Sequence, residues 1–253
     1  MTSLPGVKSV VAVTGGKGGV GKSTLAVNLA AGLAQTGISV GLLDLDLAGP
    51  SVPIMLGVSL AASQTAVLEP VKVHGIRMMS SPFFAPREPV SSWQGEKARQ
   101  AVRDLLGKVD WGTLDLLLVD LPPGERSITD ALVECVTLRG VVLVSTPQDV
   151  ALQEVQVCLE EFRRQHIDIL GLVENMSFYI CSSCGHRDHI FGHGNAADLA
   201  TRLGVAYFGA VPIDAEVRKC SDSGMPVVLK QQESPAREAL RHVVKSLTER
   251  LAA

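Results

Sequence analysis

The sequence predicts an α/β protein built on a doubly wound, mostly parallel sheet flanked by helices. Short apolar runs alternate with segments of helical periodicity along its 253 residues, an order typical of parallel strands that helices connect. Several of these runs are nearly continuous in Val, Leu and Ile, as expected for strands covered by helices on both faces. The strand-like runs are Val10–Val13, Val40–Leu43, Ile76–Met79, Leu114–Val119, Val141–Val144, Ile169–Val173 and Ala206–Val211.

Apolar residues at helical spacing predict helices over Leu25–Leu33, Lys97–Leu106, Val150–Arg164, Ala196–Leu203 and Ser234–Leu251. The last segment has a partly basic polar face, and a basic amphipathic helix can tether a protein to a membrane. Its mixed charges and ordinary length favour a helix packed on the core instead. We predict a single domain over residues 1–253, with a Cys/His-containing insertion, a loop or hairpin, at about residues 178–193.

Composition narrows the classes of function. A hydrophobic content of 46% and a formal net charge of −3 suit one globular core and show no basic footprint, so we expect no nucleic-acid partner. The chain has no signal-peptide pattern and no apolar run of about 18–20 residues, so we expect no membrane partner. Five cysteines, an odd and sparse number, favour a reducing compartment, and we expect a cytoplasmic protein.

A glycine-rich loop between the first strand and the first helix carries the strongest chemical signal. Residues 15–24 read GGKGGVGKST, which is the phosphate-binding P-loop pattern in its strand–loop–helix context. The glycines let successive N–H groups point at one anion beside a helix N-terminus. Lys22 is predicted to sit at the β- and γ-phosphates of ATP, and Ser23 to ligate Mg²⁺. The predicted nucleotide contacts are Gly16, Lys17, Gly18, Gly19, Val20, Gly21, Lys22, Ser23 and Thr24.

A second lysine, Lys17, occupies a position that the general P-loop pattern leaves free. A cation there is poorly placed for its own phosphates but could reach those of a neighbouring subunit. The stretch K-G-G-V-G-K-S over residues 17–23 resembles the deviant Walker A motif of the ATPase class that includes MinD and ParA. In that class the extra lysine crosses a dimer interface, so the resemblance implies a homodimer.

Acidic residues that end apolar strands are predicted to complete the ATP site, because such strand ends face the phosphate crevice. Asp120 is predicted to be a Walker B aspartate that holds the hydration shell of Mg²⁺. Asp46 is predicted to orient the attacking water, with Asp44 assisting near the metal. Each aspartate could instead cap a helix. Their occurrence beside a P-loop favours catalysis, with Lys17, Lys22 and Asp46 as the catalytic residues.

Further blocks extend a more specific resemblance over essentially the whole chain. Asp44–Ser51 is similar to the D-x-D-x-x-G-P-S segment of the Mrp family of P-loop ATPases, also called ApbC and including the Nbp proteins, and Asp120–Gly124 is similar to its D-x-P-P-G switch. Residues 145–149, 173–177, 191–192 and 222–226 are similar to further family blocks. The resemblance implies a dimeric ATPase that carries or assembles iron–sulfur clusters for apo client proteins. It also implies that Asn175 contacts the adenine edge, for which its amide offers a donor and an acceptor.

Cys181 and Cys184 form a C-x-x-C pair inside the predicted insertion. Two thiolates are half a ligand set, because structural zinc and a [4Fe–4S] cluster usually have four ligands. A two-fold dimer with the pair near its axis supplies the other two, and the Mrp resemblance implies such a labile, bridging cluster. Three interpretations stay open beside it: a Zn²⁺ site completed by His186, His189 or His193, a redox disulfide, and two idle thiols.

The switch after Asp120 departs from the Mrp pattern. The usual P-P-G-T-G-D is P-P-G-E-R-S over residues 122–127, which removes a threonine, a glycine and an acid close to the γ-phosphate. We therefore expect secure ATP binding and slow hydrolysis. Two alternative functions stay open, an ATP-gated positioning switch of the MinD/ParA kind and a regulatory ATP-binding protein stabilised by zinc.

Overall fold

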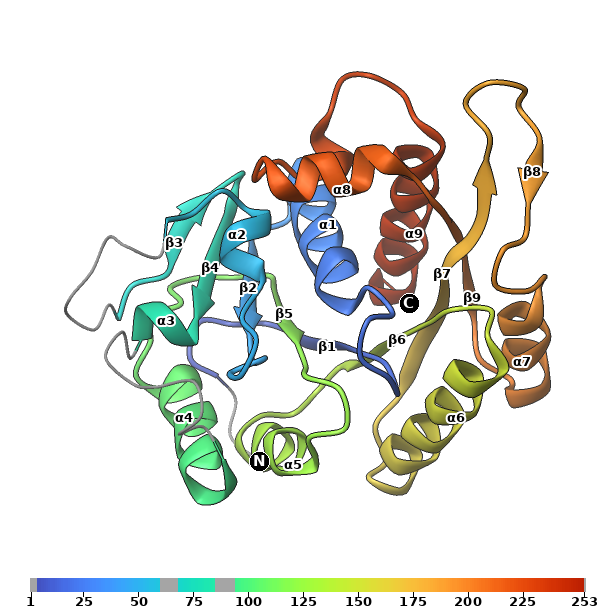
Figure 1. The fold of residues 1–253 in the computed structure, drawn as a ribbon. Helices are drawn as coiled ribbons and strands as arrows, with labels where there is room; N and C mark the ends of the chain where they lie inside the picture. Colours follow the sequence, from blue (N-terminus) through green and yellow to red (C-terminus); the bar gives the residue numbers. More distant parts are fainter. Residues whose placement is uncertain (1–3, 60–67, 85–93, 253) are drawn as a thin grey trace.

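A sheet of nine strands forms the centre of the computed structural model, which describes residues 4–59, 68–84 and 94–252. The strands are β1 (Val10–Thr14), β2 (Val40–Asp44), β3 (Val71–Val73), β4 (Ile76–Ser80), β5 (Leu116–Asp120), β6 (Gly140–Ser145), β7 (Ile169–Ile180), β8 (Arg187–Asp188) and β9 (Tyr207–Ile213). Their order is β3-β4-β2-β5-β1-β6-β7-β8, and β9 pairs with β7 (Figure 1). Among the described strands, the antiparallel pairs are β3 with β4 and β7 with β8.

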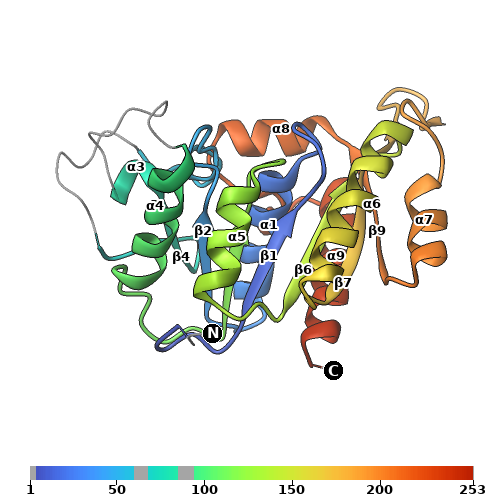
Figure 2. The ribbon, with the colours of Figure 1, turned by 90° about the horizontal axis from the view of Figure 1, so that it is seen from below.

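Helices cover both faces of the sheet. On one face, α1 (Lys22–Gln35) packs beside α9 (Pro235–Ala252), and α8 (Ala215–Asp222) lies across them. Figure 2 shows the other face, which α4 (Gly95–Gly107), α5 (Arg126–Cys135) and α6 (Asp149–Arg164) cover. The remaining helices are α7 (Asn195–Leu203) at the β9 side, the short α2 (Val52–Met55) and α3 (Ser81–Phe84), and a 3₁₀ turn at Val227–Leu229. No helix in the described ranges is both long and apolar enough to cross a membrane.

The predicted fold class is confirmed. Every predicted strand-like run overlaps a strand of the sheet, and every predicted helix overlaps a helix. The central strands β1, β2, β5 and β6 are buried along their whole length, as continuous apolar runs indicate. The elements that were not predicted from the sequence are the short β3, β8, α2 and α3, and also α5 and α8. In α8 the single buried residue is Cys220, so this helix has almost no apolar period to detect.

Parallel pairing brings the carboxyl ends of the central strands into line. Asp44, the last residue of β2, is the register partner of Asp120, the last residue of β5. Asp120 is also the partner of Val13 in β1. The loop that follows β1 therefore starts beside both aspartates, and this edge of the sheet positions the candidate site.

β7 is longer than the strand predicted over Ile169–Val173. Its register with β9 shifts between Asn175 and Tyr179, and Met176 has a positive φ of 55°, so the strand is irregular there. Beyond this point Tyr179 and Ile180 pair with β8 in antiparallel fashion. The predicted insertion at 178–193 thus contains a β7–β8 hairpin that continues the strand past the edge of the central sheet (Figure 1).

Candidate functional site

The P-loop joins β1 to α1, and close packing excludes side chains at several of its positions. A Cβ on Gly15 would lie 2.4 Å from the carbonyl oxygen of Val144, and one on Gly16 would lie 2.3 Å from the carbonyl carbon of Glu154. Gly21 has a φ of +91°, in the left-handed region that favours glycine. The loop is therefore held tightly against β6 and α6, with its N–H groups at the start of α1.

Lys22 is the first residue of α1 and is 7% exposed. Its Nζ donates a hydrogen bond to the carbonyl oxygen of Lys17 over 3.1 Å, so the ammonium lies within the curve of the loop. Burial lowers the pKa of Lys22, and the negative charges of Asp120 and Asp46 oppose this effect. A buried cation among loop N–H groups is suited to binding phosphate.

The Lys17 side chain is exposed at the outer part of the loop. Among the residues that the structure describes, its ammonium has no hydrogen-bond or ion-pair partner. Lys17 and Lys22 therefore differ sharply, since one cation is buried inside the cradle and the other faces solvent. A solvent-facing lysine at this position is available to a second molecule.

Asp120 is 1% exposed, and within the described ranges neither of its carboxylate oxygens has a hydrogen-bond partner. Burial raises the pKa of Asp120 to about 7, while the nearby Ser23 hydroxyl and the Lys22 ammonium oppose the rise. Burying a carboxylate without partners is unfavourable. A hydrated Mg²⁺ between Ser23 and Asp120 would give these oxygens partners, so the donor set fits the predicted metal.

Asp44 lies beside Asp120, and both of its oxygens are already in use. Oδ1 accepts a hydrogen bond from the Asp46 N–H over 3.1 Å, and Oδ2 accepts one from the Ser80 hydroxyl over 3.0 Å. Burial, followed by the charge of Asp120, raises the pKa of Asp44 well above its ordinary value. Asp44 thus sits near the predicted metal and fixes the path of the chain toward Asp46.

Asp46 lies in the loop between β2 and α2 and is half-buried. Its Oδ1 accepts a hydrogen bond from the Gly49 N–H over 2.9 Å, which orients the carboxylate. The charge of Asp46 acts on the pKa values of Lys22 and Asp120. The structure therefore brings the predicted catalytic residues Lys22 and Asp46 together with Asp120 around one loop.

Two cavities flank the P-loop. The smaller one, of about 260 Å³, is lined by the start of the loop, the segment after Asp120 and the facing sides of α5 and α6. The larger one, of about 500 Å³, is lined by Gly21 and Thr24, by β7 and by the β9–α8 connection. A nucleotide with its phosphates over the loop would lie next to both cavities, and the larger one, beside Gly21 and Thr24, has room for its adenosine.

Asn175 lines the larger cavity from the middle of β7. Its Nδ2 donates a hydrogen bond to the carbonyl oxygen of Val20 over 2.8 Å, and a Cβ on Gly21 would lie 2.1 Å from the same nitrogen. The amide nitrogen is thus engaged with the P-loop. The predicted contact with adenine has to use the Oδ1 oxygen or follow a rotation of the side chain.

The wall of the larger cavity that β9 and α8 form was not predicted from the sequence. Pro212, Ile213 and Asp214 belong to this wall, together with Val217 and Arg218 from α8. The Asp214 carboxylate accepts a hydrogen bond from the Glu216 N–H over 2.8 Å and caps the helix. A signal was present, because Asp214 directly follows an apolar strand, as Asp120 does.

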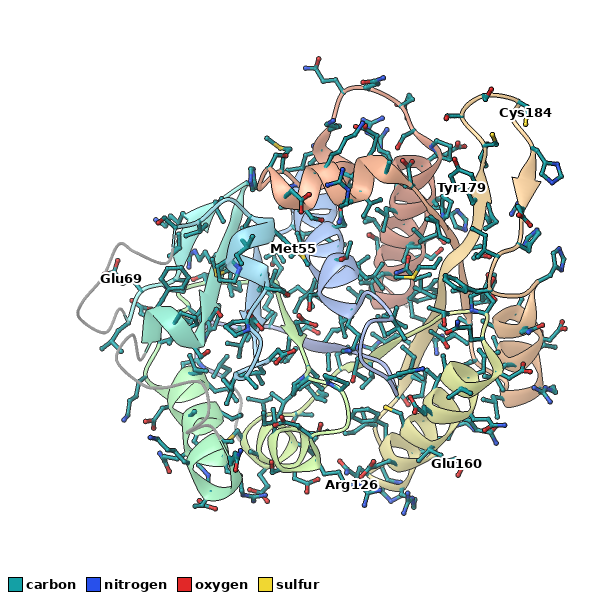
Figure 3. All side chains as sticks on the ribbon, in the orientation of Figure 1. Met55, Glu69, Arg126, Glu160, Tyr179 and Cys184 are labelled. Atoms are coloured by element: carbon teal, nitrogen blue, oxygen red, sulfur yellow. The ribbon has the colours of Figure 1, made fainter. Side chains whose placement is uncertain are left out.

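Cys181 and Cys184 lie at the turn of the β7–β8 hairpin, and Figure 3 shows Cys184 at its end, pointing away from the sheet. Two hydrogen bonds of 2.9 Å close the turn, from the Gly185 N–H to the Cys181 carbonyl and from the Cys181 N–H to the His186 carbonyl. Backbone N–H groups of Cys184 and Ser183 lower the pKa of the Cys181 thiol. This favours the thiolate, the form that binds metals.

The histidines near the hairpin are engaged with one another. The His189 Nδ1 lies 3.2 Å from the Ser177 carbonyl oxygen, and the His189 and His193 ring centroids are 4.2 Å apart. Within the described residues, no three His, Cys, Asp or Glu side chains are arranged to hold a metal ion. The alternative zinc site is therefore not preformed among the described residues of one chain. Cys181 and Cys184 supply two potential metal ligands.

Known proteins resemble this chain along nearly its whole length. A family profile described as NUBPL iron-transfer P-loop NTPase matches residues 6–248. The chain is 41% identical to an iron–sulfur cluster carrier protein of Aquifex aeolicus, covering 97% of this chain and 69% of that protein. It is also 41% identical to the iron–sulfur cluster transfer protein NUBPL of Mus musculus, covering 98% of this chain and 79% of that protein.

Solved structures show the same fold. A nucleotide-binding protein of Archaeoglobus fulgidus in complex with ADP superposes with a TM-score of 0.75 at 36% identity, over 88% of this chain and 89% of that one. The septum site-determining protein MinD of Pyrococcus horikoshii, complexed with Mg-ADP, has a TM-score of 0.73 at 21% identity, over 97% of each chain. The predicted P-loop family is confirmed, and the chain belongs to the NUBPL iron-transfer P-loop NTPases.

Proposed function

We propose that this protein is an ATP-binding, slowly ATP-hydrolysing homodimer that carries iron–sulfur clusters and delivers them to apo client proteins. Two features of one chain carry the proposal, because each is suited to a counterpart from a second copy. Lys17 is an exposed cation beside a complete phosphate cradle, and the hairpin offers two thiols, Cys181 and Cys184. A second copy of the chain would complete both, and the names of the relatives support the cargo.

ATP is proposed to bind with its phosphates on the loop N–H groups and Lys22. Ser23 and Asp120 would hold Mg²⁺, which offsets phosphate charge when bound. Asp46, oriented by the Gly49 N–H, would direct water at the γ-phosphorus. The new P–O bond forms as the bond to the bridging oxygen breaks, and ADP and phosphate leave. Lys17 of a second copy would neutralise charge that develops on the terminal phosphate.

The cluster is the cargo in this proposal. Two hairpins meeting at a two-fold axis would offer four thiolates, the usual number for a [4Fe–4S] cluster. Thiols at the end of a hairpin are open to a client, whose own thiolates can replace them one at a time. The proposal therefore places loading and delivery at Cys181 and Cys184, away from the nucleotide cavities.

Anaerobic reconstitution tests the cargo. Wild-type protein should gain absorbance near 400 nm, with about four irons per dimer for a [4Fe–4S] cluster. A Cys181→Ala/Cys184→Ala variant should gain neither, whereas the matched Cys135→Ala variant, which changes a half-buried thiol at the end of α5, should load normally. An undiminished cluster in the double variant would exclude the hairpin as the site.

The alternative functions give different outcomes in simple assays. Stoichiometric zinc in protein purified without added iron, lost in the double cysteine variant, would favour a zinc-stabilised regulatory protein. The MinD-like fold supports testing a positioning switch, for which ATP-dependent co-sedimentation with lipid vesicles or DNA is the required result. The carrier proposal expects neither the zinc nor the co-sedimentation.

A further inference from the structure

The smaller cavity is the place where this chain departs from the Mrp pattern. Its walls combine the first residues of the P-loop with the start of α5 and one side of α6. The P-loop and the altered switch are in contact range, because a Cβ on Gly18 would lie 3.8 Å from Cγ of Pro123. Glu125 and Arg126, which replace the usual threonine and glycine, both line the cavity.

The charges around this cavity are unbalanced. Arg126 is paired, since its Nε lies 3.2 Å from Oε1 of Glu161. Glu154 has a buried Oε2 without a hydrogen-bond partner in the described part of the chain. Glu125 has no ion-pair partner in that part either. Two carboxylates, Glu125 and Glu154, therefore face the cavity without a cation of their own.

Glu125 is not needed to start the helix that follows it. Its carbonyl oxygen accepts the first helical hydrogen bonds, from the N–H groups of Ile128 and Thr129 over 3.2 and 3.3 Å. Its side chain makes no capping hydrogen bond. Burial and the charge of Asp46 raise the pKa of Glu125, so the carboxylates of Glu125 and Asp46 are close enough to interact. The side chain is therefore available to act on a ligand at this end of the loop.

We propose that Glu125 is a specificity-determining residue that weakens the binding of ATP relative to ADP until a cation from a second copy of the chain enters the cavity. The inference rests on the proposed dimer, because the entering cation is Lys17. ATP carries one more charged phosphate than ADP, and Asp46, the residue proposed to direct water at that phosphate, is near enough for its charge to raise the pKa of Glu125. An ionised Glu125 therefore repels ATP more than ADP, and a second ammonium removes the repulsion.

The role of Glu125 gives a function to the altered switch, residues 122–127. A threonine at this position would donate a hydrogen bond to phosphate, whereas an ionised glutamate can only accept. The ionised glutamate is negatively charged, as the phosphate is, and it cannot donate a hydrogen bond. ATP retention therefore depends on Lys17 of the second copy. A single copy would then bind ADP readily and hold ATP poorly, and ATP binding would be coupled to pairing of the chains.

The test compares the dissociation constants of ADP and of the non-hydrolysable analogue AMPPNP, both with Mg²⁺ at low ionic strength, where charge effects are least screened. At protein concentrations that light scattering shows to be monomeric, Glu125→Gln should bind AMPPNP about tenfold more tightly, about 1.4 kcal/mol. Its ADP affinity should stay within about twofold of wild type. Glu125→Asp, which keeps the charge, should retain the wild-type ratio.

Glu160→Gln is the matched control, because Glu160 is an exposed acid of α6 outside the cavity lining and lies on the outer side of that helix in Figure 3. It should leave both affinities unchanged. An equal change for AMPPNP and ADP in Glu125→Gln, or no change, would overturn the role of Glu125. Wild-type protein that binds neither nucleotide would instead overturn the proposed function, so the two failures are distinguishable.

Discussion

The side-chain amide of Asn175 donates a hydrogen bond to the carbonyl oxygen of Val20 over 2.8 Å, and this bond joins the middle of β7 to the P-loop. The same strand continues to Ile180 and leads directly into Cys181. A change in the loop that displaces Asn175 therefore acts on the strand that carries the cysteine hairpin. One hydrogen bond and the backbone of one strand therefore connect the P-loop with the thiols.

Asn175→Ala should weaken nucleotide binding without unfolding the protein. Loss of one hydrogen bond is worth about 1 kcal/mol, so we expect roughly a fivefold to tenfold loss of affinity, equal for ATP and ADP, because both carry adenine. Fluorescence titration with labelled ATP, ADP and GTP measures this. Unchanged affinities together with unchanged discrimination against GTP would contradict an adenine contact by Asn175.

Lys17→Ala should lower the rate of ATP hydrolysis by the dimer at least tenfold, and in monomeric protein it should leave the affinity for ATP within about threefold. The physical reason is that Lys17 is exposed, whereas the buried Lys22 lies in the phosphate cradle, so Lys17 is expected to act on the nucleotide of a second copy and not on that of its own chain. Steady-state phosphate release and equilibrium titration separate the two effects. Abolished binding with unchanged dimerisation would show that Lys17 serves its own site.

Gly16→Ala should abolish nucleotide binding and lower stability. The added Cβ would lie 2.3 Å from the carbonyl carbon of Glu154, so the loop or α6 has to move, typically at about 1–3 kcal/mol. Urea unfolding measures the change in stability, and nucleotide titration measures the change in binding. Gly107→Ala is the control, because a Cβ there meets no atom of the described residues within 4 Å, and both properties should stay close to wild type.

The nucleotide-free protein should lose stability through Asp120 as the pH rises from about 4 to about 7. Burial raises the pKa of Asp120 to about 7, above the value of an unfolded chain, so the folded state keeps a proton that the unfolded state has lost. The contribution of Asp120 to stability is fully present below its pKa in the unfolded chain. It is lost as the pH rises through its pKa in the folded protein, and the loss is roughly 2–4 kcal/mol.

Urea unfolding at a series of pH values, compared with Asp120→Asn, isolates this effect. The variant keeps the size of the side chain and has no proton to lose, so its advantage over wild type should grow toward pH 7. Saturation with Mg²⁺ and ADP should shrink the difference, because a metal favours the ionised carboxylate. A constant difference across this pH range would contradict a raised pKa at Asp120.

The sequence was sufficient to predict the sheet, because its central strands are short, continuous apolar runs that alternate with helical segments. It also predicted Lys22, Asp46 and Asp120 as neighbours of one site, since parallel strands end at one edge. Asp214 and the cavity wall at β9 and α8 were missed. Their side chains come from a distant part of the chain, and α8 has too few apolar residues to reveal its period.

What the sequence by itself determined was the family of chemistry, through local patterns such as the P-loop and the C-x-x-C pair. Only the tertiary structure decided that the Asp120 carboxylate has no hydrogen-bond partner among the described residues, while Asp44 accepts hydrogen bonds on both oxygens. It also decided that Glu125 faces the P-loop across a cavity with α6. The reason is physical, because burial, hydrogen-bond partners and charge balance depend on segments far apart in sequence that packing alone brings together.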